Sequence, residues 1–366
     1  MARCAVVGSG LAGFTAYVTL RHAGLAPDEI AVFGETADPA AAWRPRAAAI
    51  RQQRMRSEGD GHCYPASFPG LAPRAALRRR TPLPLLQSVL DRYRPTVAEF
   101  LRHADELRTA SGWDESLVPR RVAQVRAVAG GFELDGEGPF PHVLLAPGHP
   151  GLALPPELDG DPRVVHAYEP HEYARRVAVV GAGMAAATEW LNALDAGAEV
   201  VSVRRREPAR RPLNVARPLF SKRGLARFHA AGRSERAALL RSFGEPSYPP
   251  GRLWDAPVEN AARDGRFRVE ASANGAEQII CATGFRRGYA HDPVLSRLVE
   301  EHELETEERW LVLAADATVP ALTDERRTLS LAGVPAQWAY PAADTLVGMK
   351  YSARRFARRV VECPTR

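Results

Sequence analysis

Paired cysteines are missing from this sequence of 366 residues. Its four cysteines, Cys4, Cys63, Cys281 and Cys363, lie far apart, and no C-x-x-C pair occurs. This spacing excludes a C-x-x-C dithiol centre and the common zinc-binding patterns. Cys4 and Cys281 stand in apolar runs, where a cysteine is most simply a small buried side chain. We therefore expect no metal site.

Lysine and long apolar runs are also scarce. Lys222 and Lys350 are the two lysines among 49 basic residues, and the arginines are scattered although the net charge is +6. No basic stripe is interleaved with aromatic residues, so we expect no nucleic-acid partner. No run approaches the ~18 consecutive apolar residues of a membrane span, and the N-terminus lacks the order of segments that makes a secretory signal. We expect a cytoplasmic protein without a membrane partner.

The most informative feature is a glycine-rich turn near the N-terminus. Gly8-Ser-Gly10-Leu11-Ala12-Gly13 follows an apolar run and matches the full G-x-G-x-x-G pattern. In a dinucleotide-binding fold the first glycine makes the turn, the second admits a pyrophosphate and the third lets helix and strand pack closely. An acid ending the next strand, expected over residues 28–35, binds a ribose hydroxyl. The predicted site comprises Gly8, Gly10, Leu11, Ala12, Gly13 and Glu35.

A second turn of this kind begins at Gly181. It is the variant with alanine in the third glycine position, and the strand expected after it, residues 198–207, ends in three arginines instead of an acid. Guanidinium groups bind a 2′-phosphate that a carboxylate would repel, which favours NADP(H) over NAD(H). The alternative is that these arginines are a solvated strand end. The predicted site comprises Gly181, Gly183, Met184, Ala185, Ala186, Arg204 and Arg205.

Further motifs, in order, resemble a known family. They are RPTVAEFLRHADEL, LAPGHP, VVHAYEP, LNVARPLFSKRGLARF, ATGF and the C-terminal DTLVGMKYSARRFA. Together with the two turns they are similar to the two-dinucleotide-domain flavoproteins, and most to the flavin-containing and N-hydroxylating (class B) monooxygenases. The resemblance implies an α/β fold of two Rossmann-like domains, with the NADP(H) domain inserted into the FAD domain. The implied boundaries are 1–165 plus 286–366 for FAD, and 170–285 for NADP(H), with a helical insertion at about 208–260.

The resemblance also implies cofactor and catalytic positions. Residues 43–65, expected to be irregular like the whole of 36–95, resemble the flavin-facing loop of the family. The implied cofactor-binding residues are Trp43, Arg44, Gln53 and Met55 in that loop, Gly148 in LAPGHP, and Thr283 and Gly284 in ATGF. Arg56 and His62 are the candidate catalytic residues; the alternatives are that the loop residues lie on the surface and that His62 is a structural histidine.

The expected function is that of an FAD-dependent, NADPH-consuming monooxygenase. It would transfer one oxygen atom from O₂ to a small nucleophilic substrate, with amines as a candidate class, in a pocket that excludes water. Gly160 and His166 are six residues apart where the family signature has four, and Ala167 replaces its serine. Two alternatives therefore stay open: an NADPH-dependent flavoprotein reductase without oxygenation, and a non-catalytic FAD-binding protein. A homo-oligomer also stays open.

Overall fold

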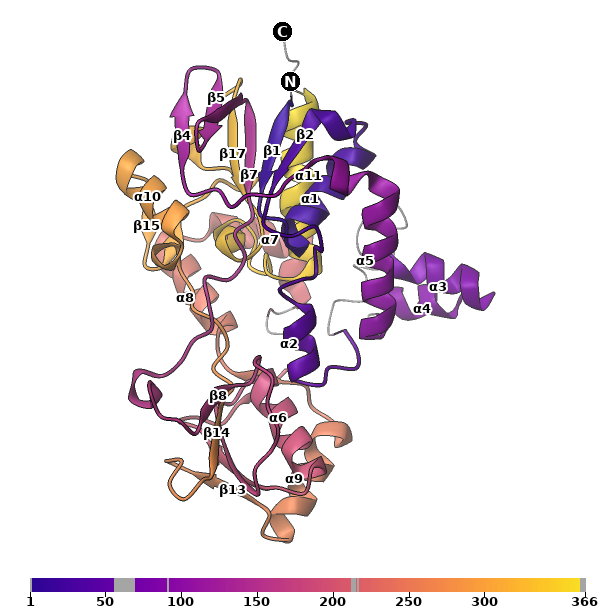
Figure 1. The fold of residues 1–366 in the computed structure, drawn as a ribbon, viewed down its shortest axis with the longest axis vertical. Helices are drawn as coiled ribbons and strands as arrows, with labels where there is room; N and C mark the ends of the chain where they lie inside the picture. Colours follow the sequence, from indigo (N-terminus) through magenta and orange to yellow (C-terminus); the bar gives the residue numbers. More distant parts are fainter. Residues whose placement is uncertain (1, 56–69, 91, 212–214, 216, 363–366) are drawn as a thin grey trace.

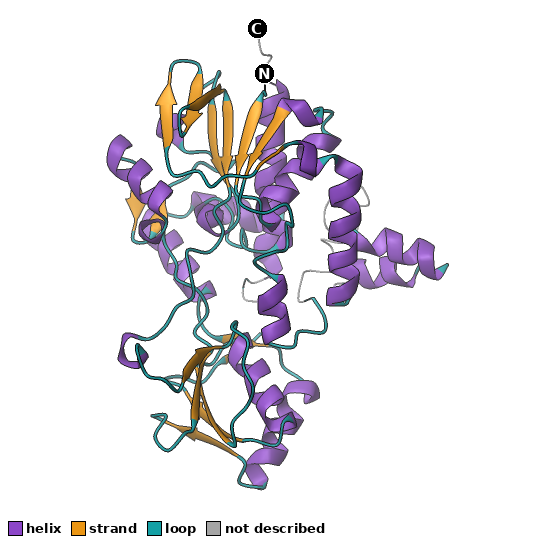
Figure 2. Cartoon of the chain, viewed as in Figure 1, coloured by secondary structure: helices purple, strands orange, loops and turns teal. Residues whose placement is uncertain are grey.

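The computed structural model describes residues 2–55, 70–90, 92–211, 215 and 217–362. Two parallel five-stranded sheets form the centres of an upper and a lower domain (Figures 1 and 2). Both chain ends lie on the upper domain, so the lower domain is inserted into it. This is the mixed α/β architecture expected from the two glycine turns. Within the described residues, no helix has the length and apolar character needed to cross a membrane.

The upper sheet has the strand order β17-β7-β1-β2-β3, with all strands parallel. Alternate residues of β1 point to opposite faces, as strand geometry requires. Cys4 and Val6 belong to the core that contains α1 and α11, whereas Ala5 faces the core that contains the small antiparallel sheet β4-β5-β6. The elements are β1 (Cys4–Val7), α1 (Leu11–His22), β2 (Ile30–Phe33), α5 (Val97–Ser111), β3 (Leu117–Val118), β4 (Val125–Val128), β5 (Gly131–Leu134), β6 (Glu137–Phe140), β7 (His142–Leu145), β17 (Thr328–Leu331) and α11 (Leu346–Glu362).

The lower sheet repeats this plan with the order β13-β10-β9-β14-β8. Its first strand by sequence, β8, pairs with β14 through Val164, Val165 and His166. The expected boundary at residue 165 therefore falls inside a strand of the lower domain, because β8 extends that sheet before the glycine turn begins. The elements are β8 (Val164–His166), β9 (Arg176–Val180), α6 (Met184–Asp195), β10 (Glu199–Val203), α9 (Arg252–Arg263), β13 (Phe267–Glu270) and β14 (Gln278–Cys281).

The helical insertion divides between the two domains. Helix α9 packs on α6 of the lower domain. In contrast, Phe228 of α7 and Leu240 of α8 are buried in the upper domain's core with Trp338. We expected the whole insertion to belong to the NADP(H) domain. Its first two helices, α7 and α8, instead pack on the upper domain, because their apolar side chains are buried in that domain's core. The other elements of the insertion are β11 (Ala209–Arg210), α7 (Lys222–Ala230), α8 (Arg233–Phe243) and β12 (Ser247–Tyr248). After the lower domain, the chain continues in the upper domain with α10 (Pro293–His302), β15 (Thr306–Glu307) and β16 (Trp310–Leu311).

Residues 36–95 are more regular than expected. The described part of this stretch, residues 36–55, 70–90 and 92–95, contains the helices α2 (Arg44–Ala49), α3 (Leu71–Arg79) and α4 (Leu83–Val89). Prolines lie at the first or second position of α2 and α4, where the missing N–H removes no helical hydrogen bond. The prolines that suggested an irregular segment therefore begin helices. Helices α3 and α4 form a hairpin that projects beyond α5 (Figure 1).

Candidate functional site

The first glycine turn is closed by the neighbouring strand. Gly8 has φ +112°, and a Cβ there would lie 2.2 Å from the carbonyl oxygen of Ala146, which follows β7. A Cβ on Gly13 would lie 1.8 Å from the carbonyl oxygen of Gly8. Both positions therefore exclude any side chain, because backbone atoms already occupy the space.

The second glycine of this turn is different. Gly10 caps the N-terminus of α1 with φ −77° and ψ −174°, and nothing lies within 4 Å of a Cβ built on it. The free N–H groups at the start of α1, from Leu11 and Ala12 onward, face the same end of the helix, which attracts an anion. A glycine that packing does not require, at the N-terminus of a buried helix, fits the pyrophosphate of a dinucleotide.

Glu35 follows β2 and is exposed. The preceding residue, Gly34, stands where the acid of such folds often lies, and a Cβ there would be 2.2 Å from Ser9 Oγ. Contact with the glycine turn thus forbids an acid at position 34 and moves it to Glu35. The role of Glu35 toward a ribose stays a prediction.

The second glycine turn repeats this geometry. Gly181 has φ +130°, and its Cβ would lie 2.6 Å from the carbonyl oxygen of Ala282, which follows β14. Gly183 caps α6 and again has nothing within 4 Å of its Cβ position. Met184 and Ala185 begin α6, and Ala186 is fully buried. The turn therefore fits a second dinucleotide.

The arginines after β10 have different surroundings. The Arg204 side chain is 12% exposed, lies over the Trp190 ring at 5.6 Å and pairs with Glu207 at 2.8 Å. The Arg205 side chain is 91% exposed and pairs with Glu157 at 3.0 Å. Stacking on a ring of α6 holds Arg204 beside the second glycine turn. Arg205 points away, which matches the alternation expected of a continuing strand.

Gly148, Thr283 and Gly284 lie on the two segments that cross between the domains, residues 147–153 and 282–286. The segments pair as a short antiparallel ribbon: Ala153 N donates to Gly284 O at 3.0 Å, and Arg286 N donates to Gly151 O at 3.0 Å. The Thr283 hydroxyl donates to the carbonyl of Ala153. The first segment follows Ala146 and the second begins at Ala282, the two alanines that close the glycine turns. The ribbon therefore connects both candidate dinucleotide sites.

An aromatic stack covers this ribbon. The Phe285 ring lies parallel to His149 at 4.0 Å and to Tyr168 at 5.0 Å, and the Arg46 guanidinium lies over it at 4.9 Å. Burial, followed by the charges of Arg287 and Arg46, lowers the pKa of His149 to about 4. His166 Nε2 contacts Gly284 O at 3.0 Å. His149, the histidine of the LAPGHP motif, is thus neutral at neutral pH and lies on the ribbon that connects the two candidate sites.

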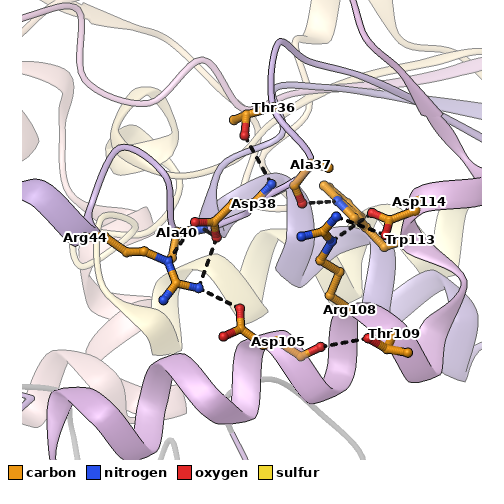
Figure 3. Close-up of polar contacts among 10 residues, drawn as sticks. All are labelled: Thr36, Ala37, Asp38, Ala40, Arg44, Asp105, Arg108, Thr109, Trp113 and Asp114. Carbon is orange, nitrogen blue, oxygen red and sulfur yellow. Dashed lines mark hydrogen bonds and ion pairs between the residues drawn. The ribbon is translucent and has the colours of Figure 1, made fainter.

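The predicted flavin-facing residues of the upper domain are held by its own contacts. Arg44 bonds Asp38 at 2.7 Å and Asp105 of α5 at 2.6 Å (Figure 3). Trp43 packs edge-on against Phe100 at 5.3 Å. Gln53 O and Met55 N form backbone bonds with Val97 and Pro95. Arg44 therefore ties α2 to α5, and contact of these four residues with a flavin stays a prediction.

The predicted catalytic residues, Arg56 and His62, lie outside the described residues, as does Cys63. Burial raises the pKa of the Cys4 thiol, and it raises that of Cys281 to about 11. Both thiols are thus protonated at neutral pH. In the described part of the chain, no three His, Cys, Asp or Glu side chains are grouped to hold a metal ion.

Several solved structures are similar to this chain over nearly its whole length. No model of a known protein family and no curated protein sequence matches it. The ornithine hydroxylase of Pseudomonas aeruginosa matches with 18% identity, a TM-score of 0.72 and 99% of both chains covered. The ornithine N-hydroxylase of Kutzneria sp. 744, solved with reduced FAD, NADP⁺ and L-ornithine, matches with 14% identity, a TM-score of 0.74 and the same coverage. Bacillithiol disulfide reductase of Bacillus cereus matches with 13% identity, a TM-score of 0.60 and 99% coverage of both chains. The chain therefore has the two-dinucleotide-domain fold of the flavin monooxygenases.

Proposed function

We propose that this chain is an FAD-dependent, NADPH-consuming monooxygenase that transfers one oxygen atom from O₂ to a small nucleophilic substrate. The observation that carries the proposal is the pair of glycine turns, each with an unobstructed second glycine at the N-terminus of a helix. Two of the solved structures that cover the whole chain are ornithine hydroxylases. The activity for which these two enzymes are named supports an amine nitrogen as the oxygen acceptor.

The chain's own residues would bind and orient the two cofactors. The N-terminus of α1 would hold the FAD pyrophosphate and the N-terminus of α6 that of NADPH, since both present free N–H groups. Arg204 would bind the 2′-phosphate. Bound FAD supplies the redox and oxygen chemistry, and the protein supplies position and exclusion of water.

The test has two stages. FAD should co-purify with the protein, and NADPH oxidation should greatly exceed NADH oxidation at equal concentration. With a panel of small amines under labelled O₂, a product should carry one labelled oxygen atom. Hydrogen peroxide in place of product, with every amine, sulfide and ketone in the panel, would refute oxygenation.

A reductase without oxygenation is the second candidate. It is favoured by one observation: a disulfide reductase shares the fold over 99% of the chain. The two candidates differ in where electrons go. A reductase would consume NADPH in the absence of O₂ when offered a disulfide or quinone acceptor, and its products would carry no labelled oxygen.

The cellular setting of the proposed enzyme is also a proposal. NADPH dependence suits the cytoplasm, and a homo-oligomer is compatible with the fold. Fractionation of the source cells tests the first, and light scattering of the purified protein tests the second.

A further inference from the structure

A small, partly open pocket lies at the carboxyl end of the upper sheet. Gly148, beyond β7, and Gln337, in the short helix η8 (Val334–Trp338) beyond β17, form one side. Trp310 and Leu311 of β16 and Leu295 of α10 provide apolar walls. In open parallel sheets, ligands bind at the carboxyl ends of the strands, so the pocket has the right place for one.

Two arginines line this pocket, Arg287 and Arg309. Arg287 Nη1 lies 3.4 Å, and Arg309 Nη2 3.7 Å, from the point where a Cβ on Gly244 would stand. The two nitrogens are thus no farther apart than the sum of these distances, which is within the reach of a single multi-oxygen group. The Arg309 guanidinium stacks over the Trp310 ring, 4.7 Å from its centroid, and this contact holds the arginine in place.

Neither guanidinium has a carboxylate within ion-pair distance among the described residues. Their neighbours differ: Arg241 pairs with Glu308, and Arg233 pairs with Glu305 at 2.6 Å. Asp292 also lines the pocket, but its carboxylate caps α10 by accepting from Val294 N and Leu295 N, both at 3.0 Å, and forms no ion pair with either arginine. The pocket therefore holds two guanidinium groups that no described carboxylate binds directly.

The two positive charges of this pocket also repel each other. Burial lowers the pKa of Arg309, and the positive charges of Arg287 and Arg241 lower it further. Asp344 lies near enough to Arg287 for that positive charge to lower the pKa of its carboxyl, although burial, the larger effect, raises it. Two like charges held together in a half-buried wall are unfavourable unless an anion joins them.

We propose that Arg287 and Arg309 bind an anionic group of the substrate, a carboxylate or a phosphate. Both groups present several oxygens to the two guanidinium forks, and the apolar walls would contact the carbon skeleton. This assignment rests on the proposed function for its statement that the bound molecule is the substrate. It adds that the nucleophile and the anion belong to one small molecule.

The first experiment needs neither NADPH nor O₂. FAD-saturated protein is treated with phenylglyoxal, which modifies arginine, in the presence of inorganic phosphate or acetate, and the modified sites are located by mass spectrometry. Modification of Arg287 and Arg309 should be lost with either anion, whereas the exposed neighbour Arg286 should react equally throughout. Unchanged modification of the pair with both anions would overturn the proposal. Protection seen only without FAD would assign the two arginines to the cofactor and would overturn it as well.

The second experiment uses matched substrates and variants. Each pair consists of an amine and the same amine bearing a carboxylate or a phosphate, for example putrescine with ornithine, and ethanolamine with phosphoethanolamine. In Arg287→Gln and Arg309→Gln, the KM of the anionic member should rise roughly 10- to 150-fold, the loss of one charge-assisted bond, while kcat and the neutral member change little. Arg286→Gln is the matched control and should leave both unchanged. Equal KM values for the two members of every pair in the wild-type enzyme would overturn the anion site but leave oxygenation intact. Protection of the two arginines by anions, without any oxygenated product, would support the anion site and refute oxygenation.

Discussion

Gly10 and Gly13 of the first turn are expected to respond in opposite ways to substitution. Gly10 has φ −77° and ψ −174°, in the extended region that a β-branched residue adopts readily, and its Cβ position is open. The Gly10→Val substitution should therefore leave the FAD-free fold intact, with the free energy of unfolding changed by less than about 1 kcal/mol. The added side chain would stand where the pyrophosphate approaches the backbone.

The expected loss of FAD affinity follows from the bonds that the turn offers. If the branched side chain keeps the pyrophosphate from two N–H groups, each worth about 1.5–3 kcal/mol as a charge-assisted bond, binding weakens by about 3–6 kcal/mol. This corresponds to a roughly 10²- to 10⁴-fold higher Kd. The assays are flavin content after purification, Kd from quenching of flavin fluorescence, and Tm of the FAD-free protein.

Two further substitutions serve as controls for Gly10→Val. Gly232 also caps a helix, α8, in an extended conformation with φ −60° and ψ 161°, and nothing lies within 4 Å of its Cβ position. Gly232→Val should change neither Tm nor FAD binding. Gly13→Ala should prevent folding of the upper domain, because its Cβ would lie 1.8 Å from Gly8 O. A stable Gly10→Val protein that keeps full flavin content and an unchanged Kd would show that this turn does not bind FAD.

Predictions for four other substitutions follow from the same structure. Arg204→Ala should raise the KM for NADPH about 10- to 150-fold and leave the KM for NADH nearly unchanged. Arg205→Ala should raise the KM for NADPH less. Equally weakened binding of both coenzymes in Arg204→Ala would give Arg204 a structural role. Burial, followed by the charges of Arg3 and Arg359, lowers the pKa of His142 to about 4, so the folded state resists a proton that the unfolded state accepts. Stability should therefore fall by about 3 kcal/mol as pH falls from 6.5 to 4, and His142→Leu should flatten that part of the pH profile, measured by urea unfolding. Arg44→Ala should cost no more than about 1 kcal/mol of stability, since the pairs with Asp38 and Asp105 are partly exposed. Loss of FAD from that variant at unchanged Tm would instead make Arg44 a cofactor ligand.

The glycine turns could be read from the sequence because their requirements are local. A strand, a turn with positive φ and a helix N-terminus lie within about ten residues at Gly8 and again at Gly181, so spacing alone identifies them. The reason for a glycine at position 34 is not local, since only the structure shows that Ser9 excludes a side chain there.

The remaining features depend on distant parts of the chain. The burial of α7 and α8 against Trp338 is decided by apolar surfaces about a hundred residues apart, and the ribbon joins residues 147–153 to 282–286. Arg287 and Arg309 are single residues of an arginine-rich sequence, and no motif distinguishes them from solvated ones. Only the positions of the neighbouring carboxylates in the structure show that neither arginine forms an ion pair with a described residue.

The position of α11 has a consequence for how the chain is completed during synthesis. The last described helix packs along α1, where Phe356 and Val360 share a core with Phe14 and Val18, and Arg3 Nη2 donates to Val360 O at 2.9 Å (Figure 1). The lower domain closes its sheet with β8–β14, a continuous stretch that leaves the ribosome well before β17 and α11 do. The upper domain must wait for its final strand and helix, with one face of α1 uncovered until then. A ribosome that stalls before Leu346 would therefore present a finished lower domain attached to an aggregation-prone upper one.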